Sequence, residues 1–229
     1  IRHQLKGPNG CITNHTSSGL LSVIESAWAL REGDAERVVA VGHDAPIEPQ
    51  TLLYLDRVGL IGKDSLRPFD QRHDGCLLGE GAASFVLETE ASAQARGATI
   101  LGEYLGGGDA SEGEGLFCIR ADGDGLSRAI ELALADAQLT PADVGMVVAH
   151  GNGTQESDAS EAAALLRVFG TEMPPVTGFK WSVGHLFSSA GLLDAAVGLE
   201  ACRRNVVPGI ATLETLADSC AGLNVSQQT

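Results

Sequence analysis

The sequence predicts an α/β protein in which strands and helices alternate along most of the chain. Short apolar runs of strand length alternate with longer segments of helical periodicity, which is the pattern of a layered α/β fold. Of the 229 residues, 44% are hydrophobic, which is enough to bury a substantial core. A chain of this length forms one or two domains.

In the first part of the chain, the first predicted helix has the clearest pattern. Leu21, Ile24 and Trp28 recur every three to four residues, Gly33 ends the periodic segment, and Ser17 or Ser18 can cap its start. The elements predicted in this part are a strand at 10–14, a helix at 21–33, a strand at 37–42, an irregular or short helical segment at 51–64, a strand at 82–88, a short helix at 91–96 and a strand at 100–105.

The second part opens with a glycine-rich acidic segment, 106–124, which predicts a mobile loop or gate. Beyond it the sequence predicts an amphipathic helix at 126–137, a strand at 145–150, a helix at 157–169, a strand at 175–179 and a helix at 188–203. Pro208 terminates the turn that leaves the last helix.

Composition excludes several classes of protein. A formal net charge of -15 argues against binding to nucleic acid, whose phosphates attract clustered Lys and Arg. No apolar run approaches the ~18 residues that span a membrane, and no signal peptide opens the chain, so we expect a cytoplasmic protein. The five cysteines have no zinc spacing, and we expect them to be reduced and mostly buried, without a metal.

Four motifs carry the functional information, and they occur in one order along the chain. They are Asn14-His15-Thr16-Ser17-Ser18-Gly19, then Arg67-Pro68-Phe69-Asp70 with Asp74-Gly75 and Gly79-Glu80-Gly81-Ala82, then His150-Gly151-Asn152-Gly153-Thr154 with Asp158 and Glu161, and finally Lys180-Trp181-Ser182-Val183-Gly184-His185. The last three resemble the RPFDxxRDGFxxGEGA, HGTGTxxxDxxE and KSxxGH patterns of the β-ketoacyl-acyl-carrier-protein synthases, the ketosynthases of fatty-acid and polyketide assembly. The first resembles their Thr-Ala-Cys-x-x-Gly segment, with Thr16 where the family has its nucleophilic cysteine.

The resemblance implies a thiolase-like fold, two similar halves stacked as five layers in the order α-β-α-β-α. Residues 1–90 then match the remainder of the N-terminal half, and residues 91–229 match the C-terminal half without its final segment. The chain therefore looks like part of that plan. If nothing else is present, we expect exposed strand edges and core faces.

The resemblance also implies roles for individual residues. His150 and His185 match the two histidines that stabilise oxyanion charge, and Lys180 matches the lysine that pairs with an acidic residue matching Glu161. An ion pair of Glu161 with Lys180 that only stabilises the fold is an equally good interpretation. Asp158 and Glu80 match supporting positions. Family members need no metal or organic cofactor, only thioesters bound to an acyl carrier protein.

Thr16 leaves the activity open. A threonine hydroxyl has no accessible alkoxide near neutral pH without a dedicated base. Adjacent residues on a turn rarely face each other, so we do not expect His15 to be that base.

Three functions remain. The first is a silent subunit resembling chain-length factors, in a heterodimer with an active ketosynthase. The second is an enzyme that keeps only part of the reaction, either malonyl decarboxylation or transfer from a carrier-bound donor without covalent capture of the acyl group. The third is a condensing 3-oxoacyl-acyl-carrier-protein synthase, a homodimer or heterodimer, which is active through Thr16 or a partner's cysteine. All three predict an acyl carrier protein as partner.

Overall fold

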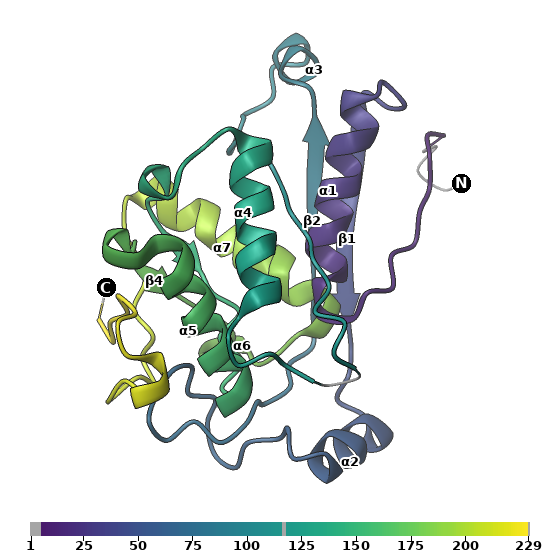
Figure 1. Ribbon diagram of the computed structural model, residues 1–229. Coiled ribbons are helices and arrows are strands. Elements are labelled where there is room, and N and C mark those ends of the chain that lie inside the picture. The colour runs from purple at the N-terminus through teal and green to yellow at the C-terminus, as the bar shows by residue number, and fades with distance from the viewer. Residues whose placement is uncertain (1–5, 116–117, 229) are drawn as a thin grey trace.

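The computed structural model describes residues 6–115 and 118–228 (Figure 1). The elements are α1 (Ser18–Arg31), β1 (Arg37–Asp44), α2 (Pro49–Arg57), β2 (Gly81–Glu88), α3 (Glu90–Ala95), α4 (Asp124–Ala137), β3 (Val147–Val148), α5 (Gln155–Phe169), β4 (Val176–Thr177), α6 (Lys180–Val183) and α7 (Ala190–Arg204). Short 3-10 turns η1 (His15–Ser17) and η4 (Phe187–Ser189) precede α1 and α7. Most of the predicted helices and strands are confirmed within a few residues.

β1 and β2 form an antiparallel pair, in register from Arg37 opposite Glu88 to Asp44 opposite Gly81. Burial alternates along both strands because successive side chains of a strand point to opposite faces. One face packs against α1 and α7. Val39, Val41 and Val86 lie exposed on the other face. In the described part of the chain, this bare face agrees with the expected exposure of core faces.

β3 and β4 form a short parallel pair, with Val147 opposite Val176 and Val148 opposite Thr177. Helix α5 covers this pair, and its Leu165 and Phe169 join Val176 in the main hydrophobic cluster. The preceding helix, α4, packs alongside α5 (Figure 1).

The layers follow a clear order. Helices α4 and α5 lie outermost, next comes the β3–β4 sheet, then α1 with α7, and then the β1–β2 sheet (Figure 1). Helix α7 contacts strands of both sheets as well as α1, so it lies between the two sheets. These are four of the five layers that the sequence predicts, in the expected order.

Two predicted strands are wrong. Residues 10–14 and 100–105 have no regular secondary structure, and Ile100 and Leu101 are exposed. A strand exists only where another backbone accepts its hydrogen bonds, and within the described chain no neighbouring strand lies there. Segment 10–14 is also largely exposed, because no neighbouring strand of the described chain covers it.

The cysteines are also less buried than expected. Cys76 and Cys220 are buried free thiols, but Cys11, Cys118 and Cys202 are exposed. Burial raises the pKa of Cys76 and of Cys220 to about 11, so both are neutral at pH 7.

The start of the glycine-rich segment packs closely on α4. A side chain at Gly106 would lie 2.5 Å from the backbone nitrogen of Ala137, and one at Gly108 would overlap the backbone of Ala129. Glycine is therefore required at these positions by the close approach of α4. That the rest of the segment acts as a gate stays a prediction, and residues 116–117 lie outside the described chain.

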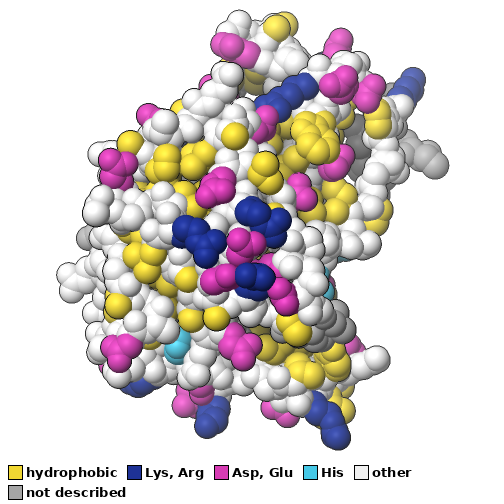
Figure 2. Space-filling model, in the orientation of Figure 1, with side chains coloured by type: hydrophobic (Ala, Val, Ile, Leu, Met, Phe, Trp, Pro, Cys, Tyr) yellow, Lys and Arg dark blue, Asp and Glu magenta, His cyan; other side chains and the backbone are white. Residues whose placement is uncertain are grey.

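The face that carries α4 and α5 mixes charges of both signs (Figure 2). Arg128 and Arg167 both pair with Asp124, and Arg120 pairs with Glu114 and Asp122. The arginines on this face are thus neutralised locally. No helix in residues 6–115 and 118–228 is long and apolar enough to cross a membrane.

Candidate active site

Thr16 lies in the turn η1, directly before α1. The preceding residue, His15, has a left-handed backbone with φ of 51°, and its ring nitrogen Nδ1 lies 3.2 Å from Oγ1 of Thr16. The expectation that these neighbours do not face each other is therefore wrong. The hydroxyls of Ser17 and Ser18 donate to the carbonyls of Asn14 and His15, so they brace the turn. Ser17 is the N-cap residue of α1, as predicted, but its side chain makes no capping hydrogen bond.

Close backbone packing holds this turn against η4. A Cβ atom at Gly19 would overlap the carbonyl oxygen of Ser188, and one at Gly42 would lie 2.8 Å from the same atom. The Ser188 hydroxyl in turn donates to the carbonyl of His43 at 2.6 Å. Glycine at positions 19 and 42 thus lets α1 and β1 both reach the turn that precedes α7.

The two predicted histidines lie together. His150 follows β3, His185 follows α6, and their ring centroids are 5.2 Å apart in an edge-to-face arrangement. The backbone N–H of Phe187 donates to Nδ1 of His185 at 3.0 Å, which leaves the ring proton on Nε2. The Phe187 ring stacks on His185 with centroids 4.8 Å apart. His185 therefore presents an N–H donor from a fixed ring.

Both histidines are neutral at pH 7. Burial, followed by the electrostatic effects of Lys180 and of the neighbouring His15, lowers the pKa of His185 to about 3. Burial, Lys180 and His185 likewise hold the pKa of His150 well below its usual value. Two neutral imidazoles that donate hydrogen bonds can stabilise an oxyanion and do not themselves compete for a proton.

Lys180 opens helix α6, and its side chain is only 1% exposed. The ammonium donates to Oδ2 of Asp194 in α7 at 2.9 Å. The predicted pairing of Lys180 with Glu161 is therefore wrong, because α7 brings a different carboxylate to the ammonium. Sequence reasoning missed Asp194, although an acidic residue in the apolar segment Ala190-Gly191-Leu192-Leu193-Asp194-Ala195 is a visible signal.

Glu161 has a different structural role. Its carboxylate accepts from the backbone N–H of His150 at 2.6 Å and of Gly151 at 2.8 Å. Burial raises its pKa to about 7, although these two hydrogen bonds lower it and the charge of Asp158 raises it further. Glu161 thus fixes the turn that carries His150.

Asp158 joins two motifs that are far apart in the sequence. Its buried carboxylate accepts from the backbone N–H of Phe69 at 2.7 Å and of Gly153 at 3.2 Å, and it contacts Nδ1 of His73 at 2.9 Å. His73 stands where the family pattern RPFDxxRDG has an arginine, and this departure is the signal by which the sequence could have identified it.

Glu80 is exposed and lies away from this network. It accepts from the backbone N–H of Ile47 at 3.2 Å and so braces the segment that leads into α2. Among the described residues, no group of three His, Cys, Asp or Glu side chains could hold a metal ion.

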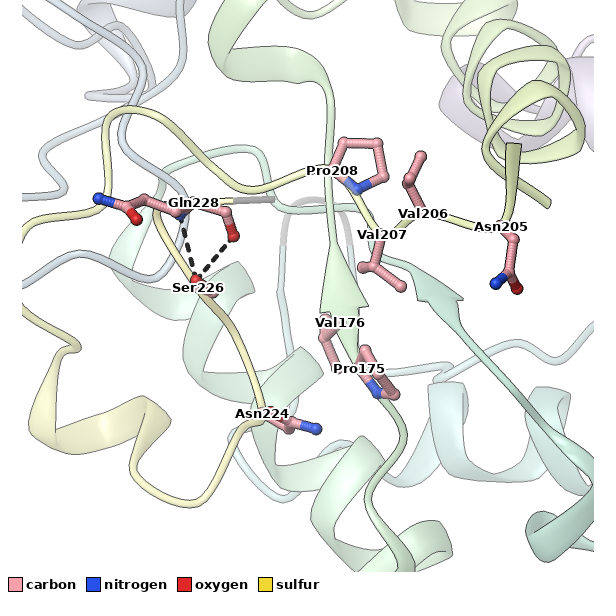
Figure 3. Close-up of a pocket in the computed structure, with 9 residues that line it drawn as sticks. All are labelled: Pro175, Val176, Asn205, Val206, Val207, Pro208, Asn224, Ser226 and Gln228. Atoms are coloured by element: carbon pink, nitrogen blue, oxygen red, sulfur yellow. Dashed lines mark hydrogen bonds between the residues drawn. The ribbon is translucent and has the colours of Figure 1, made fainter. Parts of the chain in front are cut away.

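A hollow of about 450 Å³ lies between the segment that follows α7 and the C-terminal segment (Figure 3). The residues that line it are Pro175, Val176, Asn205, Val206, Val207, Pro208, Asn224, Ser226 and Gln228. None of the predicted site residues is among them.

Comparison with known proteins matches this arrangement to one family. The chain matches the family models for the Beta-ketoacyl synthase N-terminal domain over residues 1–93 and C-terminal domain over residues 101–214. It is 33% identical over 223 residues to the tetracenomycin polyketide synthase ketoacyl synthase alpha subunit of Streptomyces glaucescens. That match covers 94% of this chain and 52% of the relative.

Solved structures give the same result. The ishigamide ketosynthase/chain length factor matches with a TM-score of 0.88 and 32% identity, over 93% of this chain and 52% of the other. A type II polyketide synthase acyl carrier protein in complex with its ketosynthase, AntDE:AntF, matches with a TM-score of 0.93 and 25% identity, over 97% and 57%. The chain thus has a thiolase-like ketosynthase fold and spans about half the length of these relatives. It belongs to the β-ketoacyl synthase family.

Proposed function

We propose that this protein is a ketosynthase-like component of polyketide or fatty-acid assembly that decarboxylates a carrier-bound malonyl thioester without forming an acyl-enzyme. The observation that carries the proposal is the combination of Thr16 at the nucleophile position with the neutral pair His150 and His185. The part of the site that stabilises charge is present, whereas the thiol that captures an acyl chain is replaced.

Decarboxylation requires stabilisation of negative charge on the thioester oxygen as the carboxylate leaves. The Nε2–H of His185, oriented by the Phe187 backbone, can donate to that oxygen, and His150 lies close enough to act on the same group. Burial, together with the positive charge of the Lys180 ammonium that Asp194 holds in place, keeps both rings unprotonated. A subunit that served only as a scaffold would not need this arrangement.

The test is incubation of the purified full-length protein with a malonyl-acyl-carrier-protein, followed by measurement of CO₂ and of the intact protein mass. We expect CO₂, the acetyl form of the carrier and no adduct on the native protein, whereas Thr16→Cys takes up an acyl group. His150→Ala and His185→Ala should each slow decarboxylation by roughly 100-fold to 1,000-fold. His43→Ala, which removes an exposed histidine outside this cluster, is the matched control. Absence of CO₂ release from the native protein would refute the proposal.

A second candidate function is full condensation, with the acyl chain held as an ester on Thr16. The contact of 3.2 Å between Nδ1 of His15 and Oγ1 of Thr16 favours it, because a base beside a hydroxyl can activate that hydroxyl. The same experiment separates the two candidates. An acyl adduct on the native protein that is lost in Thr16→Ala would establish the ester and overturn the non-acylating function.

The partners follow from the relatives. The AntDE:AntF structure contains an acyl carrier protein with its ketosynthase, and the ishigamide protein is named as a ketosynthase/chain length factor. We therefore expect this protein to bind an acyl carrier protein and to form a homodimer, or a heterodimer with an active ketosynthase. Sedimentation analysis of the protein, alone and with a co-expressed ketosynthase, distinguishes these assemblies.

A further inference from the structure

The contact between His15 and Thr16 has no counterpart in the family pattern, where these two positions are alanine and cysteine. His15 is exposed and Thr16 is half-buried. The left-handed backbone of His15 turns its ring toward the Thr16 hydroxyl, so that Nδ1 and Oγ1 lie 3.2 Å apart. A solvent-exposed imidazole is thereby connected to the hydroxyl of a half-buried residue.

A continuous array of rings links this contact to the histidine pair. The His15 ring meets Phe187 edge-on with centroids 5.2 Å apart, Phe187 stacks on His185 at 4.8 Å, and His185 meets His150 at 5.2 Å. The close packing of Gly19 against Ser188 holds η1 against η4. The turn η1, which carries Thr16, is therefore packed against η4, the turn that follows His185.

We infer that Thr16 protonates the carbon that loses CO₂, and that His15 resupplies the proton. This inference rests on the proposed decarboxylation. In a condensing enzyme the enolate attacks an acyl-cysteine. Without an acyl-enzyme, the enolate needs a proton, and Thr16 occupies the position from which the acyl carbon would otherwise be presented.

The step balances as follows. The bond between C2 and the carboxylate breaks, CO₂ leaves, and the electron pair becomes the enolate, whose oxygen is held by the histidine pair. That electron pair then forms a C–H bond with the Thr16 hydroxyl proton. The Nδ1 proton of His15 moves to Oγ1 as water protonates Nε2 of the exposed ring, and proton exchange of the ring with solvent restores the Nδ1–H form before the next turnover. The net reaction consumes one proton from solvent and releases the acetyl thioester.

Delivery from one fixed hydroxyl places the new hydrogen on one face of the enolate. The test uses a malonyl-acyl-carrier-protein that carries tritium at one of its two C2 positions, in D₂O, so that the methyl group of the product carries three hydrogen isotopes and has a handedness. We expect one handedness in large excess from the native protein, from Thr16→Ser and from the control His43→Ala. We expect a racemic methyl group in the product that Thr16→Val still forms, because solvent then protonates the enolate from either face. We expect unchanged handedness but slower turnover from His15→Ala, because Thr16 still delivers its proton and regains it only from solvent.

Each result is decisive. A racemic product from the native protein, unchanged handedness in Thr16→Val, or unchanged turnover in His15→Ala would overturn the inference and leave the proposed decarboxylation standing. Loss of CO₂ release in both variants, with unchanged circular dichroism spectra, would also overturn it, because protonation follows cleavage of the C–C bond. If the native protein releases no CO₂, the proposed function itself fails.

Discussion

Lys180 and Asp194 form a buried ion pair between helices α6 and α7, with 2.9 Å between Nζ and Oδ2. The lysine side chain is 1% exposed and the aspartate side chain 13%. A buried ammonium without a partner is strongly unfavourable, whereas burial already raises the pKa of Asp194 and lets it accept a proton. Loss of the Asp194 carboxylate should therefore destabilise the fold more than loss of the Lys180 ammonium.

We predict that Asp194→Leu lowers the free energy of unfolding by about 3 to 5 kcal/mol because it strands the Lys180 ammonium. Lys180→Met should cost less, since the Asp194 carboxyl can become neutral, and the double variant should be more stable than Asp194→Leu alone. Urea unfolding of the three variants measures these differences. A double variant as unstable as Asp194→Leu would show that the cost does not come from the unpaired cation.

Among the groups that set the pH dependence of stability, His185 and Glu161 act in opposite directions. The pKa of His185 falls from 6.5 to about 3 on folding, so the unfolded state binds more protons between these values and stability rises with pH. The pKa of Glu161 rises from 4.5 to about 7, so the folded state binds more protons between those values and stability falls with pH.

We therefore predict that Glu161→Gln makes stability rise more steeply between pH 4.5 and 6.5 than in the native protein. The added slope should approach about 1.4 kcal/mol per pH unit, the free energy equivalent of one proton. The glutamine amide oxygen can still accept from His150 N–H. Unfolding at a series of pH values checks this prediction, and parallel curves for the two proteins would contradict it.

The Asp158 carboxylate is buried and holds three donors, including the His73 ring. We predict that Asp158→Ala lowers the free energy of unfolding by roughly 3 to 5 kcal/mol because two backbone N–H groups and His73 lose their acceptor. His73→Arg, which restores the residue of the family pattern, should be tolerated. Guanidinium unfolding tests both variants, and a stable Asp158→Ala protein would exclude this role.

Gly19 sets the distance between α1 and η4. We predict that Gly19→Ala costs about 1 to 3 kcal/mol of stability, because its methyl group overlaps the Ser188 carbonyl and the backbone must move. Displacement of η4, which follows His185, should also slow decarboxylation. Gly145→Ala is the matched control, since no atom lies within 4 Å of a Cβ at that position. Equal stability and activity of the two variants would argue against close packing at Gly19.

Much of the secondary structure could be predicted because its signals are local. Helix α1 and strand β1 could be predicted from the periodicity of their apolar residues and from turn residues a few positions away. Both signals act on the backbone within a short stretch of the chain. The order of the motifs identified the family, and the positions of Thr16, His150 and His185 followed from it. Each of these inferences depends on residues close together in the chain.

The tertiary structure decided which groups meet. Residues 10–14 and 100–105 have the apolar composition of strands, but a strand requires a partner whose position no local pattern specifies. The tertiary arrangement of α6 and α7 brings Asp194 to Lys180. The left-handed backbone of His15 turns its own ring toward Thr16. Local composition thus determined the elements and the family, whereas pairings between distant groups, and one backbone dihedral angle, decided the chemistry of the site.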